Sequence, residues 1–287
     1  MLRTSGAAVL GLSAFSLGRI AAAVTEKDQR KQKVLLFTRS PIWEHPWIVR
    51  EGAGLSKIET IFSALGQKAG LEVVCTKDGA VFDGDLDQYD GIVFYATGNL
   101  LTDKCDTPQP GAAMSAEGKK RLLAAVEAGK GFVGIHPATT CFPSEGVDPY
   151  IAMVGAEFIM HGKPQKATMR VASSKFPGME GLGNAFSMDE EWYAQRKFAK
   201  DLHVILVQET AGMQGEWYQR PPFPATWARM HGKGRVFYTS MGHQEIWNDK
   251  TFQQVLLGGI AWALRNVDAD VTPNIDTVTP DANVLNK

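Results

Sequence analysis

The sequence predicts an α/β fold built on a doubly wound, mostly parallel sheet within a single domain. The first observation behind this prediction is a series of short continuous apolar runs, typical of strands covered on both faces. The second is that these runs alternate with stretches whose apolar residues have helical spacing. The third is size, since 287 residues with 44% apolar and 21% charged residues suit one large globular domain or two small ones.

The first half of the chain alternates strands and helices. Helices are expected at 54–69 and 116–128, with Ser115 in a capping position and Gly70 and Gly129 just past the helix ends. The expected strands are 33–38, 71–76, 91–95 and 131–135. This order favours right-handed crossovers between parallel strands.

The second half is more mixed. Helices are expected near 149–158 and 249–265, and strand-like runs lie at 166–172, 203–208, 225–230 and 234–239. No linker divides the domain, which we place at 33–266. The tail at 267–287 loses periodicity and gains Pro, Asp and Asn, so we expect it to wrap the surface or to be disordered.

The N-terminus predicts export. Residues 7–18 form an apolar run that is too short for a stable membrane span but suits the core of a signal peptide. Ala21, Ala22 and Ala23 form a small-residue cleavage site, so residues 1–23 are the expected signal peptide and the periplasm the expected location. The opening residues resemble the segment after the arginine pair of twin-arginine signals, and although no Arg-Arg pair is present, we expect the true start to lie slightly upstream. The alternative is a hydrophobic N-terminal helix.

Charge and cysteine content exclude several classes of protein. The formal net charge of −1 argues against nucleic-acid binding and fits a neutral substrate such as a sugar. Cys75, Cys105 and Cys141 form no C-x-x-C pair, which excludes a zinc ribbon and a thioredoxin-type site. Base rates alone favour a homo-oligomer.

One glycine motif matches the dinucleotide-binding pattern but does not predict a dinucleotide site. Residues 129–134 match G-x-G-x-x-G, but a dinucleotide site needs these glycines after a strand and at the start of a helix. Here they follow a helix and enter a strand. The motif therefore predicts a helix end and a tight strand entry.

Four of the six histidines fall in loops at one predicted edge of the sheet. His45, His136 and His243 follow strands at their carboxyl ends, where open α/β sheets bind ligands. His161 lies in a loop next to Gly162, whereas His203 and His231 have no such position. A single histidine is more often structural, but four together predict a shared site of proton carriers or metal ligands.

Several motifs together resemble the ThuA-like family, named for trehalose utilisation, over residues 33–266. They are GIHPAT at 134–139, GAEF at 155–158, EEWY at 190–193, PATWARMHGKGRVFYTSMGH at 224–243 and LLGGIAWA at 256–263. The resemblance implies a fold similar to flavodoxin and to class I glutamine amidotransferases, and a role in carbohydrate metabolism.

The resemblance also implies a set of site residues. They are His45, His136, His161, Glu191 and His243. His136 occupies the turn that carries the cysteine nucleophile of amidotransferases, so we expect no glutaminase activity, with Cys141 structural or incidental. His243 and Glu245 resemble the amidotransferase His-x-Glu pair. Thr140 departs from the family, because many relatives have Asp at this position.

Adjacent acids and nearby aromatic residues allow two interpretations each. Glu190 and Glu191 are ordinarily solvated, but Trp192 and Tyr193 beside them predict a partly buried carboxylate with a raised pKa. Tryptophans near the histidine loops suit either sugar stacking or the core. They are Trp43, Trp47, Trp192, Trp217, Trp227 and Trp247.

Three functions follow from these observations. The leading one is an isomerase, lyase or hydrolase of a sugar or keto-sugar, with His136 and Glu191 as acid and base, His243 sharing their role, and His161 in the same site. The second is a metal-dependent hydrolase or lyase that holds Zn²⁺ or another divalent metal through His45, His136, His161 and His243. The third is a non-catalytic sugar-binding module.

Overall fold

The computed structural model describes residues 30–285. The signal peptide expected at residues 1–23 lies outside the described residues. From Gln32 onward the chain forms one compact unit. Between residues 30 and 285, no helix has both the length and the apolar character needed to cross a membrane.

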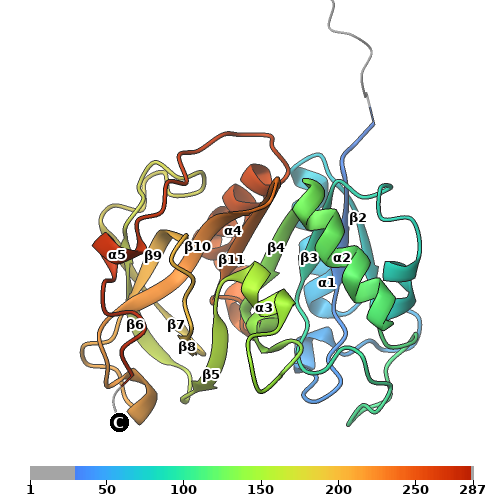
Figure 1. The fold of residues 1–287 in the computed structure, drawn as a ribbon, viewed down its shortest axis with the longest axis horizontal. Coiled ribbons are helices and arrows are strands. Elements are labelled where there is room, and N and C mark those ends of the chain that lie inside the picture. Colours follow the sequence, from blue (N-terminus) through green and yellow to red (C-terminus); the bar gives the residue numbers. More distant parts are fainter. Residues whose placement is uncertain (1–29, 286–287) are drawn as a thin grey trace, which may run out of the picture. The chain divides into compact units, whose positions relative to one another are not determined.

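Within residues 30–285, nine strands form one mixed sheet in the order β2-β1-β3-β4-β11-β10-β9-β6-β7 (Figure 1). The parallel half contains β1 (Lys33–Phe37), β2 (Glu72–Thr76), β3 (Gly91–Phe94), β4 (Gly131–Ile135) and β11 (Gly234–Thr239). The antiparallel half contains β10 (Phe223–His231), β9 (His203–Glu209), β6 (Gln165–Val171) and β7 (Ala185–Glu190). A separate antiparallel pair joins β5 (Glu157–His161) and β8 (Tyr193–Arg196).

The α/β class and the single domain are confirmed, but the sheet as a whole is mixed instead of mostly parallel. The physical reason is the length of the connections. Parallel strands need a crossover of a dozen or more residues, which the first half supplies as helices. In the second half, β10 pairs with β11 through a hairpin that turns at Gly232 and Lys233, and so short a connection can join only antiparallel strands.

Helices cover both faces of the parallel strands (Figure 1). On one face lie α1 (Lys57–Lys68) and α4 (Lys250–Ala263), and on the other lie α2 (Ala116–Ala128) and α3 (Pro149–Val154). Successive side chains of β1 point to opposite faces of the sheet, so each face needs its own cover of helices. Leu36 packs in the core with α1 and α4, and Phe37 packs in the core with α2 and α3.

Serine and aspartate side chains cap the four helices that cover the parallel strands. Ser56 and Glu59 form a capping box at the start of α1, and Ser115, Asp148 and Asp249 accept hydrogen bonds from the first turns of α2, α3 and α4. The predicted cap at Ser115 is confirmed.

Two details differ from the sequence prediction or extend it. The helix expected at 149–158 ends at Val154, because Gly155 adopts a left-handed conformation (φ 106°) and the chain continues as β5. The C-terminal tail is ordered through residue 285 and includes α5 (Ile275–Val278). Its Asn274 and Asn283 side chains bond the main chain of Val204 and Phe198.

The glycine motif at 129–134 has the expected role, since Gly129 caps the end of α2 and Gly131 begins β4.

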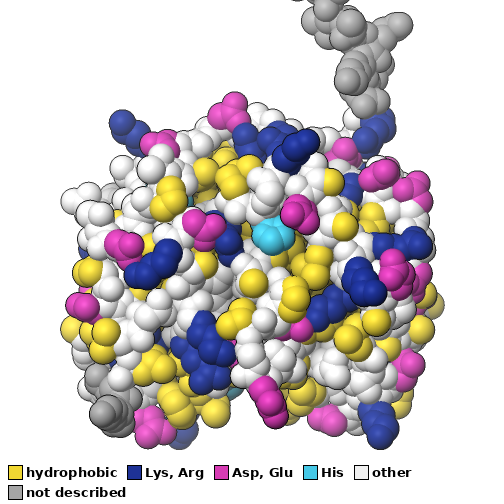
Figure 2. All heavy atoms as spheres, viewed as in Figure 1, with side chains coloured by type: hydrophobic (Ala, Val, Ile, Leu, Met, Phe, Trp, Pro, Cys, Tyr) yellow, Lys and Arg dark blue, Asp and Glu magenta, His cyan; other side chains and the backbone are white. Residues whose placement is uncertain are grey.

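On the face shown in Figure 2, basic and acidic side chains are interspersed.

Candidate active site

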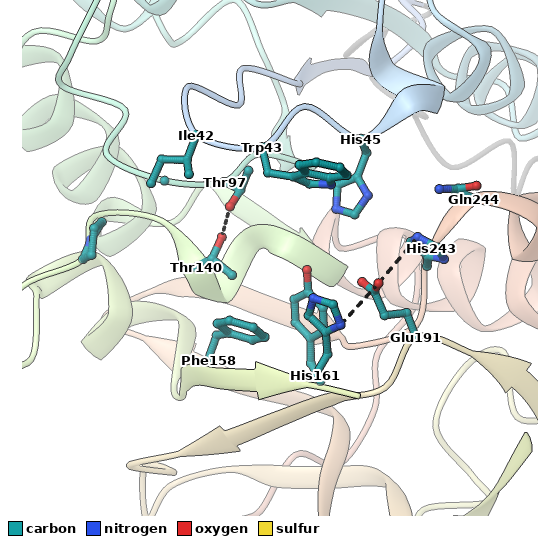
Figure 3. A pocket seen from close by; sticks show the side chains of 13 residues that line it. Ile42, Trp43, His45, Thr97, Thr140, Phe158, His161, Glu191, His243 and Gln244 are labelled. Atoms are coloured by element: carbon teal, nitrogen blue, oxygen red, sulfur yellow. Dashed lines mark hydrogen bonds and ion pairs between the residues drawn. The ribbon is translucent and has the colours of Figure 1, made fainter. Parts of the chain in front are cut away.

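A pocket of about 650 Å³ brings together loops from both halves of the chain. His45, His161, Glu191 and His243 all line it, as Figure 3 shows. Apolar and hydroxyl side chains form the rest of its wall, including Ile42, Trp43, Thr97, Thr140, Pro143, Phe158 and Tyr193. The structure therefore gathers four of the predicted residues in one cavity, and the fifth, His136, lies directly behind them.

His136 is the first residue after β4 and is fully buried. Its backbone has φ 43°, a left-handed conformation that is strained for a residue with a side chain and common at functional turns. Its Nδ1 lies 2.7 Å from the carbonyl oxygen of Ser240, which can only accept, so Nδ1 carries a hydrogen. Its Nε2 is therefore directed at Glu191, with 3.4 Å to Oε2.

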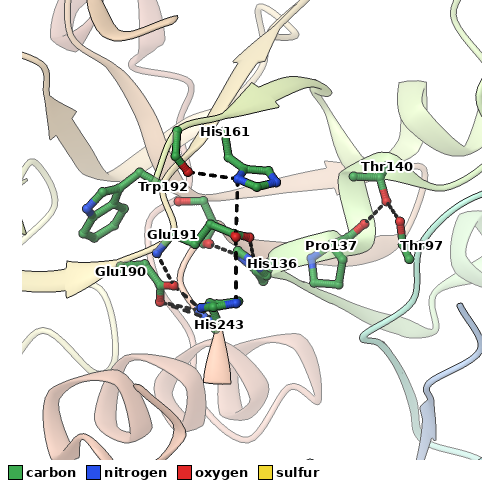
Figure 4. A network of polar contacts seen from close by, with 12 residues as sticks. Thr97, His136, Pro137, Thr140, His161, Glu190, Glu191, Trp192 and His243 are labelled. Carbon is green, nitrogen blue, oxygen red and sulfur yellow. Dashed lines mark hydrogen bonds and ion pairs between the residues drawn. The ribbon is translucent and has the colours of Figure 1, made fainter. Parts of the chain in front are cut away.

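Glu191 is the centre of the cluster, as Figure 4 shows. Besides His136 on Oε2, its Oε1 lies 3.3 Å from Nδ1 of His161 and 3.8 Å from Nε2 of His243. Burial acts to raise the pKa of Glu191, but the 3.4 Å contact with Nε2 of His136 and the charges of the surrounding histidines lower it to about 2. At neutral pH this carboxylate is therefore ionised.

His45 completes a triangle of imidazoles. The ring centroids of His45, His136 and His243 lie 5.5–5.7 Å from one another. Burial, followed by the charges of His136 and His243, lowers the pKa of His45 to about 3. Burial also lowers the pKa of His243. These two rings are therefore neutral at pH 7, and Nδ1 of His45 is buried with no hydrogen-bond partner among residues 30–285.

Glu190 has a different environment from its neighbour. Its buried carboxylate accepts main-chain hydrogen bonds from Glu191 (2.8 Å), Gly242 (2.9 Å) and His243 (3.2 Å). Burial acts to raise the pKa of Glu190, and the three main-chain donors, which favour the ionised form, act in the opposite direction. The expectation of a raised pKa in this acidic pair is thus confirmed for Glu190 and wrong for Glu191.

Tyr95 and Thr97 lie near the site and were not predicted from the sequence, whereas Tyr193 and Thr140 were. The Tyr193 ring lies 4.0 Å from that of His136, centroid to centroid, and Tyr95 packs against both His45 and His136. The hydroxyl of Thr140 contacts that of Thr97 inside the pocket. A tyrosine that ends or follows a strand is also common in protein cores, so no sequence signal distinguished Tyr95 as a site residue.

Other residues that the sequence analysis considered lie away from the histidine cluster around Glu191. Cys141 is buried with its thiol against the carbonyl of Ala96, and burial raises its pKa, so it is a structural residue. Glu245 is exposed, and the carboxylate in contact with His243 is that of Glu191. His203 bonds Ser173 and the main chain of Thr272 outside this pocket.

The tryptophans divide between the two interpretations. Trp43 is 64% exposed and lines the pocket, which suits contact with a ligand. Trp192, Trp227 and Trp247 are fully buried in the core, and Trp47 and Trp217 pack partly buried against it.

The residues present do not form a ready-made metal site. Among the described residues 30–285, no group of three or more His, Cys, Asp or Glu side chains is arranged to hold a metal ion.

Solved structures with a similar fold include two ThuA-like proteins. The one from Parabacteroides merdae has a TM-score of 0.64 and 17% identity, and the match covers 84% of this chain and 92% of that one. The one from Bacteroides uniformis has a TM-score of 0.58 and 18% identity, with 81% and 91% covered. A β-galactosidase from Rahnella sp. R3 matches with a TM-score of 0.51 and 15% identity over 82% of this chain but only 31% of its own.

No curated protein matches the sequence significantly. The family comparison is decisive, because residues 33–263 match the ThuA family, described as trehalose utilisation, and this span contains every residue of the histidine cluster. The chain therefore belongs to the ThuA family.

Proposed function

We propose that the protein is an enzyme of carbohydrate metabolism that transfers protons next to the carbonyl group of a keto-sugar. The observation that carries the proposal is the convergence of three histidines on one carboxylate that lines a pocket, with His45 as a fourth imidazole beside them. The membership of the ThuA family supports a carbohydrate substrate. The exposed ring of Trp43 and the ring of Phe158 supply apolar faces of the kind that pack against sugar rings.

The geometry supports a division of roles within the cluster. His136 is the proposed base, because its Nδ1–H is fixed on Ser240 and its Nε2 is left to accept a proton. Since this ring is fully buried behind Glu191, the substrate has to reach it from the pocket past that carboxylate. Glu191 is a weak base at a pKa of about 2, so its proposed role is to stabilise the imidazolium that forms on His136. His243 and His161, on the other carboxylate oxygen, are the proposed donors to the substrate oxygen.

The same site supports the exclusion of glutamine hydrolysis. The parallel strands follow the order β2-β1-β3-β4-β11, which is the flavodoxin-like order and supports an amidotransferase-like fold. However, the turn after β4 carries an imidazole instead of a thiol. Pro137 follows it, and proline lacks the main-chain N–H that hydrolases use at this position to bind an oxyanion.

The proposal is tested by turnover of mono- and disaccharides in which one ring hydroxyl is oxidised to a ketone. We expect His136→Ala and His243→Ala each to reduce kcat by about 10²-fold or more, while the variants keep a cooperative melting transition. His231→Ala, outside the pocket, is the matched control. Unchanged turnover in both site variants would refute the proposal, and binding of these sugars by the wild type without product would favour a sugar-binding module.

A metal-dependent version is a second proposal. It is supported by the buried, unpartnered Nδ1 of His45 beside His136 and His243. Since no three ligands are preassembled among residues 30–285, the ion would have to draw these side chains together. Metal analysis of the purified protein decides the question. Stoichiometric Zn²⁺ or another divalent ion with loss of activity on chelation supports this version, and a metal-free, chelator-insensitive enzyme excludes it.

A further inference from the structure

The main chain of Gly242 is held by hydrogen bonds at both its carbonyl oxygen and its N–H. Its carbonyl oxygen accepts hydrogen bonds from the Tyr95 hydroxyl (3.0 Å) and from Nε1 of Trp247 (2.7 Å). Its N–H donates to Oε2 of Glu190 at 2.9 Å. The residue immediately before His243 is therefore fixed by three side chains from three separate elements.

The Glu190 carboxylate extends this contact to two site residues. Its Oε1 accepts the main-chain N–H of Glu191 at 2.8 Å and that of His243 at 3.2 Å (Figure 4). Glu191 lies in the β7–β8 turn and His243 in the loop after β11, so these two residues are about fifty positions apart in the chain. The buried side chain of Glu190 thus connects the main chain of Glu191 to the main chain of His243.

The fit around this contact is tight. Gly242 has φ 140°, and a Cβ at this position would lie 2.7 Å from Cγ2 of Ile135 and 3.0 Å from Cβ of His136. The loop is therefore pressed against the strand end that carries His136, and a shift of the Gly242 peptide would move His243 relative to both His136 and Glu191.

We propose that Glu190 is a positioning residue that sets the placement of Glu191 relative to His243. This inference rests on the proposed acid–base function of those two side chains. Both Glu190 oxygens accept main-chain N–H groups, which a carboxylate can satisfy at once. An amide of the same shape has one acceptor and would direct an NH₂ donor at a main-chain donor.

The test compares Glu190→Gln with Asp189→Asn. Asp189 is the preceding residue of β7 and is exposed, so its variant makes the same chemical change one position away. We expect Glu190→Gln to lower kcat at least tenfold with KM changed less than about threefold, as a misplaced catalytic group would. If this variant does not fold, Glu190→Asp keeps the charge but is too short to hold both loops, and the same loss of kcat is expected.

A second readout is independent of any substrate. Side-chain ¹H–¹⁵N spectra of histidine-labelled protein at pH 7 report the environment of each ring. In Glu190→Gln or Glu190→Asp the His243 resonances should move while those of His203 and His231 stay in place, and Asp189→Asn should move none of them. A folded Glu190 variant with unmoved His243 resonances and unaltered kcat overturns the inference. Moved resonances in a protein inactive on every keto-sugar would support the positioning role and refute the proposed function.

Discussion

His45 is a base that the folded protein keeps neutral, and this has a consequence for stability in mild acid. Its side chain is only 3% exposed, and burial lowers its pKa from 6.5 to about 3, with further lowering from His136 and His243. In the unfolded chain the ring takes up a proton as the pH falls through 6.5, whereas in the folded protein it stays neutral until the pH approaches 3. Acid therefore favours the unfolded state.

The size of this effect follows from linkage. Wherever the unfolded chain binds one more proton than the folded one, each pH unit changes the free energy of unfolding by about 1.4 kcal/mol. From pH 6.5 to pH 5 the His45 contribution is about 2 kcal/mol of lost stability, and it requires only that the folded pKa lies below 5. Above pH 6.5 both states have a neutral ring and the contribution vanishes.

Urea unfolding of the wild type and of His45→Gln at pH 7.5 and pH 5.0 measures this contribution. Both proteins lose stability from other titrating groups, so the quantity of interest is the difference between their pH-dependent losses. We expect the wild type to lose about 2 kcal/mol more than His45→Gln, with equal m-values. Equal losses in the two proteins would mean that His45 is solvated or charged, and would refute the description of the site as a buried cluster of neutral bases.

Two further substitutions test the pocket wall and the loop. Trp43→Ala should raise KM for a sugar substrate about three- to tenfold with little change in the free energy of unfolding, because the ring is 64% exposed and lines the pocket. An unchanged KM in steady-state kinetics would show that the ring makes no contact with the ligand. Gly242→Ala should cost more stability in urea than Gly181→Ala, by about 1–3 kcal/mol, since both glycines have positive φ but only Gly242 has atoms within 3.0 Å of the added Cβ; equal losses would show that the loop can move aside.

The parallel half of the fold could be predicted because its strands are buried on both faces. The runs at 34–37 and 132–135 are continuously apolar, and this pattern predicts a strand buried on both faces. The strands β5, β7 and β8 were missed for the opposite reason. The residues of β7 alternate between exposed and half-buried, so the segment contains polar residues and resembles a loop.

The meeting of His45, His136 and His243 could be predicted from topology, since these residues follow the parallel strands β1, β4 and β11, whose carboxyl ends meet at one edge. His161, expected in a loop, instead ends the antiparallel strand β5, so the same argument does not cover it. What the sequence could not give is the environment of each acid. Glu190 and Glu191 are neighbours, yet one is enclosed by main-chain donors and the other by imidazoles, because the chain leaves β7 between them. The opposite shifts in their pKa values depend on groups about fifty residues away, such as Gly242 and His243.

The proposed reaction begins when the cluster removes a proton from the carbon next to a sugar carbonyl. The most direct measurement is incorporation of deuterium into that position of a keto-sugar in D₂O, followed by mass spectrometry for the wild type and for Glu191→Gln. We expect deuterium at this carbon with the wild type and a rate lower by about 10²-fold with Glu191→Gln. Product formed without deuterium, or equal incorporation by the two proteins, would contradict it.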